Sequence, residues 1–90
     1  MKISYNQYIQ NNQNIKSQMN GIKNIEKKIR IEQKTEKKYY SNLNMAVKTN
    51  NSTTAVTALD QVIAEQQQIL SDTNGESLAL TNLLNSLNPL

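Results

Sequence analysis

A three-and-four repeat of largely apolar positions runs through the second half of this chain, between residues 53 and 88. Alternating spacings of three and four are typical of the seam along which one helix packs lengthwise on another helix, as in a coiled coil. The phase of the repeat continues through Gly75, so we predict one long second helix, softened at Asn74-Gly75. The repeat consists of Val56, Leu59, Ile63, Gln66, Leu70, Thr73, Ser77, Leu80, Leu84 and Leu87.

The first half of the chain supplies a matching apolar face. Its helical pattern becomes regular from Ile15 and is interrupted by the polar segment 32–38, where the seam position falls on Glu36. We therefore predict a first helix from about residue 5 to residue 48, with the usual uncertainty of a few residues at each end. The predicted face carries Ile15, Met19, Ile22, Ile25 and Ile29, and then Tyr39 or Tyr40, Leu43, and Ala46 or Val47.

A polar segment, residues 48–54, separates the two helical patterns. Asn50, Asn51, Ser52 and Thr53 are residue types that form turns and cap helix N-termini. So short a connection returns the chain antiparallel to itself, and Pro89 ends the second helix. We predict an all-α antiparallel two-helix hairpin, residues 5–48 and 53–88, that forms a single domain over residues 1–90.

The position of the turn predicts which residues face each other. A hairpin that turns near residue 51 pairs residues whose numbers add to about 102. This register makes both ends of the seam apolar and its centre polar, because it sets Glu36 against Gln66. The apolar pairs are Leu43 with Leu59, Tyr39 with Ile63, Ile22 with Leu80 and Ile15 with Leu87, and the other central pairs are Ile29 with Thr73 and Ile25 with Ser77.

The net charge of +3 is divided unevenly between the two halves. All ten Lys and Arg residues lie in residues 1–48, which carry +7, whereas residues 49–90 carry −4. The predicted register sets Lys37 opposite Glu65 and Arg30 opposite Asp72, and Glu26 is spaced for an i,i+4 ion pair with Arg30. Exposed pairs of this kind select a register more than they stabilise it.

A basic run in the first helix is the one feature that suits phosphate binding. It contains Lys23, Lys27, Lys28, Arg30, Lys34, Lys37 and Lys38, followed by Tyr39 and Tyr40. The cations surround the helix and are interspersed with acidic residues, which favours a solvated face over a nucleic-acid or membrane surface. Nucleic-acid binding stays open as an alternative.

The composition offers little for catalysis. His, Cys and Trp are absent, and the remaining carboxylates, hydroxyls and lysines are not placed by a Gly-rich loop or a nucleophile elbow. Asp60, Asp72 and Glu76 are too widely spaced to form an oxygen cage for a metal ion. We therefore predict no catalytic, metal-binding or cofactor-binding residues.

The chain is polar and short, and this bears on its partners and its location. Its mean hydropathy is −0.67, and a domain of 90 residues buries only a modest core. We therefore expect it to complete its burial against other copies or another protein chain. The opening residues lack the apolar region of a secretory signal, and no apolar run is long enough to span a membrane. These features predict a protein that is cytoplasmic, or exported without a signal peptide.

The outline resembles a known group of secreted helical hairpins. About ninety residues, the opening Lys2-Ile3-Ser4-Tyr5, a turn near the midpoint and a second helix to the end are similar to the WXG-type hairpins of type VII secretion, and to the small helical partners of LXG toxins. Where that family has Trp-x-Gly in the turn, this chain has Asn50-Asn51-Ser52. The resemblance implies a non-enzymatic structural or targeting partner of a helical toxin domain or a related small protein.

The C-terminal half of this chain is similar to a second group of proteins. Residues 48–87 match the spacing of the second half of type III secretion needle subunits, although this turn has no proline. That resemblance implies a filament subunit. Both resemblances imply a small hairpin that packs beside other helices in a secretion pathway. The residues that carry this second likeness are Ala46, Val47, Lys48, Val56, Leu59, Ile63, Ile69, Leu70, Leu83 and Leu84.

Overall fold

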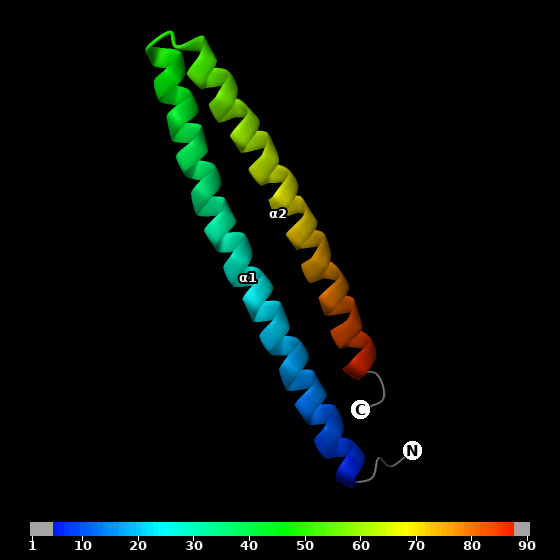
Figure 1. Cartoon of the computed structure of the whole chain (residues 1–90). Helices are drawn as coiled ribbons and strands as arrows, with labels where there is room; N and C mark the ends of the chain where they lie inside the picture. The colour runs from blue at the N-terminus through cyan, green and yellow to red at the C-terminus, as the bar shows by residue number, and fades with distance from the viewer. Residues whose placement is uncertain (1–4, 88–90) are drawn as a thin grey trace.

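The chain folds as two long helices that lie side by side. The computed structural model describes residues 5–87, and the side chains of residues 13–87. Helix α1 spans Tyr5–Lys48 and helix α2 spans Ser52–Leu87. They run antiparallel from a short turn, and α1 extends beyond the end of α2 (Figure 1). The Cα atoms extend over 69 × 14 × 12 Å. The predicted all-α hairpin is thereby confirmed.

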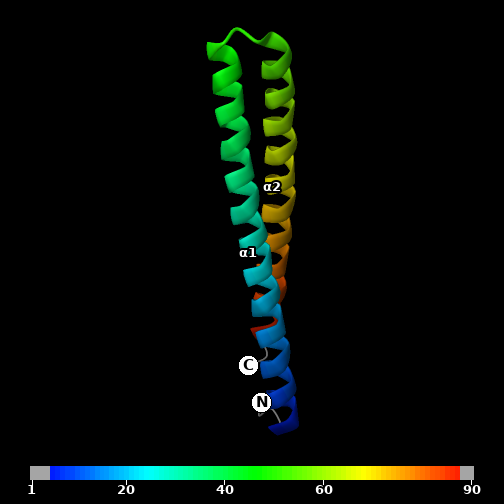
Figure 2. The same cartoon turned by 60° about the vertical axis from the view of Figure 1, so that its left-hand side comes forward.

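The two helices cross at a small angle. In the second view, α2 passes behind α1 toward the lower end of the molecule (Figure 2). Helix α2 is one uninterrupted α-helix that continues through Asn74-Gly75, as the phase of the repeat predicts, and it shows no break at the softening expected there. A Cβ atom added at Gly75 would meet no other atom within 4 Å, so packing does not require glycine at this position.

The turn ends α1 in a Schellman motif. The N–H of Asn50 donates to the carbonyl of Val47 at 3.1 Å, and the N–H of Asn51 donates to the carbonyl of Ala46 at 2.9 Å. Asn50 has a φ of 55°, which is the left-handed conformation that this motif needs at the residue after the helix. Asparagine tolerates that conformation better than most residues with a side chain.

Asn51 also begins α2. Its side-chain Oδ1 accepts a hydrogen bond from the N–H of Thr54 at 3.1 Å, and its carbonyl accepts the first helical bond, from Ala55, at 2.9 Å. This geometry is that of an N-cap residue, as predicted for this segment. One residue therefore takes part in the end of one helix and the start of the next, which makes the connection short.

Replacing this cap will destabilise the hairpin. We expect Asn51→Ala to lower the free energy of unfolding by about 1 kcal/mol, because the N–H of Thr54 loses its acceptor. Ser52→Ala, which alters the adjacent exposed residue, is the matched control and will change stability by less than half as much. Thermal unfolding followed by circular dichroism measures both variants. Equal effects of the two would contradict the capping role.

The helices contact each other along a seam that differs from the predicted one on α2. On α1 the half-buried and buried residues include Ile15, Ile22, Ile25, Ile29, Tyr39 and Leu43, as predicted. On α2 the residues that face α1 form what we call the inner seam. The inner seam consists of Ala55, Ala58, Val62, Glu65, Ile69, Asp72, Glu76, Ala79, Leu83 and Ser86.

The inner seam lies one residue before the repeat that the sequence suggested. Since one residue turns an α-helix by about 100°, the predicted positions from Val56 to Leu87 lie to one side of the contact with α1 and are exposed. The register also differs by two residues. Gln18 donates a hydrogen bond to Ser86 at 2.8 Å, where the prediction placed Leu84. The expected register is therefore wrong for the pairs of Leu43 with Leu59, Tyr39 with Ile63, and Ile15 with Leu87, and for the central pairs of Glu36 with Gln66, Ile29 with Thr73 and Ile25 with Ser77. Ile22 and Leu80 still line one hollow at the edge of the contact.

Small residues explain which face of α2 turns inward. Ala46 and Ala58 are 3% and 2% exposed, and Val62 is 2% exposed. The turn holds the helix ends close together, and alanine allows the backbones to approach where leucine would hold them apart. A leucine-rich face next to so short a turn would overpack the contact.

Candidate functional site

The outward face of α2 carries a row of large apolar side chains, interrupted by Gln66, Thr73 and Ser77. Seven of them are between 42% and 61% exposed within the hairpin. They stand at positions of a three-and-four repeat typical of a helix-packing seam, yet neither of the two described helices covers them. We call this row the outer stripe. It consists of Val56, Leu59, Ile63, Leu70, Leu80, Leu84 and Leu87.

Two side chains of α1 add to this face of the hairpin. Tyr40 is 40% exposed, and its hydroxyl accepts a hydrogen bond from Nε2 of Gln66 at 2.9 Å. Met19 is 45% exposed and lines a hollow of about 230 Å³ together with Leu80 and Leu83. The apolar surface therefore spreads from α2 onto the adjacent edge of α1.

The outer face of α2 is almost free of charge. This helix contains no Lys or Arg, and its acidic residues are Asp60, Glu65, Asp72 and Glu76. Glu65, Asp72 and Glu76 are half-buried toward α1, which leaves Asp60 as the exposed carboxylate of the helix. A surface of this kind suits an apolar partner better than a charged one.

A carboxyl pair lies at the centre of the contact between α1 and α2. Glu32 of α1 is only 8% exposed and lies close enough to Asp72 of α2 for the two carboxyl groups to share a proton. Nζ of Lys28 lies 3.4 Å from Oδ1 of Asp72, and Nε2 of Gln68 donates to both oxygens of Asp72 at 3.3 Å. Asp72 is thus held by neighbours on both helices.

The pKa values of Glu32 and Asp72 are shifted in opposite directions. The hydrogen bond to Asp72, burial, and the negative charges of Asp72 and Glu65 raise the pKa of Glu32 to about 7, against an opposing effect of Lys28. The hydrogen bond from Glu32, together with those from Gln68 and Lys28, holds the pKa of Asp72 below its usual value. Oε2 of Glu32 is buried and finds no hydrogen-bond donor among the described residues. A protonated Glu32 that donates to an ionised Asp72 is the arrangement this geometry favours.

The predicted ion pairs are partly confirmed. Arg30 pairs with Glu26 through Nη2 and Oε2 at 3.6 Å, as the i,i+4 spacing predicts. The expected pair of Arg30 with Asp72 is wrong, because Lys28 occupies that place. Lys37 and Glu65 form no ion pair within the described residues, because α2 is rotated and shifted from the predicted register. All seven cations of the basic run are exposed, as expected for a solvated face.

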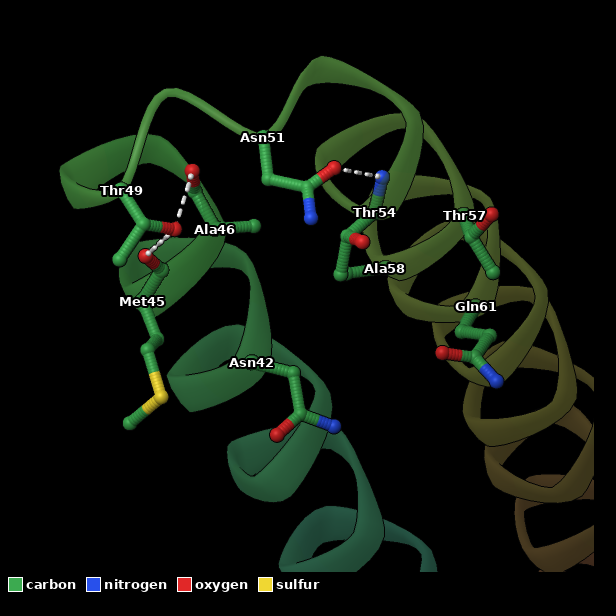
Figure 3. A pocket seen from close by; sticks show the side chains of 9 residues that line it. All are labelled: Asn42, Met45, Ala46, Thr49, Asn51, Thr54, Thr57, Ala58 and Gln61. Carbon is green, nitrogen blue, oxygen red and sulfur yellow. Dashed lines mark hydrogen bonds between the residues drawn. The ribbon is translucent and has the colours of Figure 1, made fainter.

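A shallow hollow of about 330 Å³ lies beside the turn (Figure 3). The Thr49 hydroxyl donates to the carbonyl of Met45 at 2.9 Å, and Asn51 caps α2 at the opposite wall. The side chains around the hollow are amides, hydroxyls, alanines and one methionine. None of them is an acid, a base or a charged group, so the hollow offers only hydrogen bonds.

The predicted interface residues fall into two groups. Ile15, Ile22, Ile25, Ile29, Tyr39 and Leu43 lie in the contact between the helices, while Met19 is at its exposed edge. The α2 members, Val56, Leu59, Ile63, Gln66, Leu70, Leu80, Leu84 and Leu87, lie on the outer face. All eight are exposed, although Gln66 donates to Tyr40 of α1 and Leu80 lines a hollow with Met19 and Ile22 of α1. Their role in binding a partner stays a prediction. Sequence reasoning missed Glu32 with Asp72, although Glu65, Ile69, Asp72 and Glu76 have seam spacing.

The described residues contain no group of three or more acidic side chains arranged to hold a metal ion. Within residues 5–87, neither helix has the length and apolar character that crossing a bilayer requires. No family model, curated protein or solved structure matches this chain. The fold and the site define the chain as an all-α helical hairpin with one apolar face left uncovered.

Proposed function

We propose that this hairpin is a non-enzymatic structural or targeting partner in a protein complex, which it joins by packing the outer stripe against other helices. The observation that carries this proposal is the exposure of seven large apolar side chains in one helical row, from Val56 to Leu87. Single exposed leucines are ordinary, but seven large apolar side chains gathered on one helix face mark an interaction surface. The row is about 46 Å long at 1.5 Å per residue, enough for a partner helix of some thirty residues.

The context we propose is type VII secretion, with a helical toxin domain of the LXG kind or a related small helical protein as partner. The support is the hairpin shape, the length of 90 residues and the near-central turn. A needle-like filament subunit is the second candidate, since it also needs an uncovered helix face. Nucleic-acid binding is the third, and it would use the exposed cations of α1.

A complex with the product of an adjacent LXG-type reading frame tests the proposal. We expect the full-length hairpin, co-expressed with the helical N-terminal domain of that product, to form a stoichiometric complex that persists from about 50 to about 500 mM salt. The double variant Ile63→Asp, Leu80→Asp will abolish the complex, because it places charges in an apolar contact. Both positions are exposed in the hairpin, so circular dichroism will show that the variant keeps its helices.

The matched control changes charge on the other helix. The triple variant Lys34→Glu, Lys37→Glu, Lys38→Glu alters exposed residues of α1 and will leave the complex intact. If this variant or high salt abolishes binding while the stripe variant retains it, the electrostatic alternative is correct. Filaments of the hairpin alone would favour the needle-like candidate, and the absence of any complex would refute the secretion partner.

A further inference from the structure

The outer stripe reads nearly the same in both directions. The row of positions that contains the outer stripe also includes the polar residues Gln66, Thr73 and Ser77, and its midpoint lies between Ser71 and Asp72. Four of the five pairs at equal distances from this midpoint carry side chains of the same kind, and the central pair of Leu70 with Thr73 does not. The outer three pairs are apolar with apolar, and the next pair is polar with polar. The pairs are Val56 with Leu87, Leu59 with Leu84, Ile63 with Leu80, Gln66 with Ser77, and Leu70 with Thr73.

This symmetry is what an antiparallel contact between two identical helices requires. A two-fold axis places each residue of one copy against its symmetric counterpart in the other, so one surface must be complementary to itself. Along the outer stripe, the large apolar residues near the turn would meet the leucines near the end of α2. The polar pair of Gln66 and Ser77 would meet near the centre, where it leaves no amide facing a leucine.

Charge and helix dipoles favour this direction over a parallel contact. In a parallel pair, the two exposed Asp60 carboxylates would lie side by side, and the helix dipoles would point the same way. In the antiparallel pair, the second Asp60 lies at the level of Leu83, about 35 Å along the helix axis. That distance exceeds the Debye length of about 8 Å at physiological salt, so repulsion between the two carboxylates is screened.

We propose that a second copy of this chain covers the outer stripe, with its α2 antiparallel to the first about a two-fold axis near residues 71 and 72. The inference rests on the proposed function, because it assigns a second occupant to the same surface. The dimer covers the outer stripe when the partner helix is absent, and the partner helix replaces the second copy when the complex forms. In the contact between two copies each outer stripe is fully covered by the other, so no stripe remains to bind a third copy. The contact therefore gives a dimer and not a filament.

Cysteine crosslinking of the full-length chain tests the register directly, because the natural sequence contains no cysteine. An equimolar mixture of Leu59→Cys and Leu84→Cys chains will form a disulfide-linked dimer under mild oxidation. Each variant alone will not, since in the antiparallel pair each new cysteine lies about 37 Å from its copy. A Thr81→Cys variant, exposed on α2 outside the stripe, mixed with either variant controls for random collisions.

Sedimentation supplies a second measurement without any cysteine. The wild-type chain will sediment as a dimer, and Ile63→Asp, which enters the contact twice, will weaken the dimer by about 100-fold while the helices remain. Crosslinking of either cysteine variant alone would show a parallel pair and overturn the proposal. A wild-type monomer would also overturn it, and would leave the proposed function standing if the complex with the LXG-type product still forms. A wild-type dimer that forms no complex with the LXG-type product would support the dimer and refute the proposed function.

Discussion

The variant Glu32→Gln will unfold at nearly the same temperature at pH 5 and pH 8, whereas the wild-type hairpin will be less stable at pH 8. The pKa of Glu32 is raised from its ordinary value of 4.5 to about 7 in the folded chain. The folded state therefore binds this proton more tightly than the unfolded state does. Its contribution to stability is complete below pH 4.5 and is lost as the pH rises through about 7.

Asp72 has the opposite dependence, because its pKa is lowered from its ordinary value of 3.8. Its contribution is present above that value and is lost as the pH falls below it. The pair is therefore most favourable near pH 4 to 5, where Glu32 is protonated and Asp72 is ionised. Glutamine mimics the protonated Glu32, since its amide donates a hydrogen bond and carries no charge.

At pH 8 we expect Glu32→Gln to exceed the wild-type chain by about 1 kcal/mol in the free energy of unfolding. For a chain of this size, this corresponds to about 4 to 8 °C in Tm. Thermal unfolding at one fixed protein concentration measures it, because association also shifts Tm. Asp60→Asn, on the exposed side of α2, is the control and will keep the wild-type pH dependence. Wild-type stability that rises steadily from pH 5 to pH 8 would show that Glu32 is ionised in the folded chain.

The second large effect concerns the close contact beside the turn. Ala58→Glu places a charged side chain at a position that is 2% exposed, where it faces Ala46, itself 3% exposed. Leaving an unpaired charge in such a contact costs about 3 kcal/mol or more, a large fraction of the stability of a small domain. We expect the hairpin to lose its cooperative thermal transition and much of its helical signal.

Ala64→Glu provides the matched control, since it makes the same substitution at an exposed position of the same helix. Both changes have the same effect on helix propensity, so the difference between them reports the contact between α1 and α2. Far-ultraviolet circular dichroism during heating compares the two. If Ala58→Glu melted like Ala64→Glu, the close approach of Ala46 and Ala58 would not contribute to the fold.

Much of the fold was predictable from the sequence because it follows from local rules. The polar segment around Asn51 predicted both the break and the cap, and the three-and-four spacing predicted helices on either side. The bounds of both helices agree with the prediction within one residue at the ends that the structure describes. The α1 face from Ile15 to Leu43 was also found, since a single apolar face exists there.

The face of α2 was not predictable in the same way, because this helix carries two repeats with seam spacing, one residue apart. The repeat that begins at Val56 has the larger side chains and was taken as the contact with α1. The one that begins at Ala55 is smaller and contains Glu65, Asp72 and Glu76. Hydrophobicity alone favours the Val56 repeat as the contact with α1, whereas the tight turn favours the Ala55 repeat. The burial of Glu32 was not predicted either, because carboxylates ordinarily lie on the surface.

The turn has a further consequence for how this chain could change. The Schellman motif and the N-cap share Asn51, which fixes the rotation of α2 about its own axis. Inserting or deleting one residue there would rotate the helix by about 100°. A deletion would turn the outer stripe toward α1 and the inner seam outward, without any alteration in α2 itself. The length of the turn, together with the small residues beside it, therefore determines whether the leucines of α2 pack within the hairpin or are exposed to a partner.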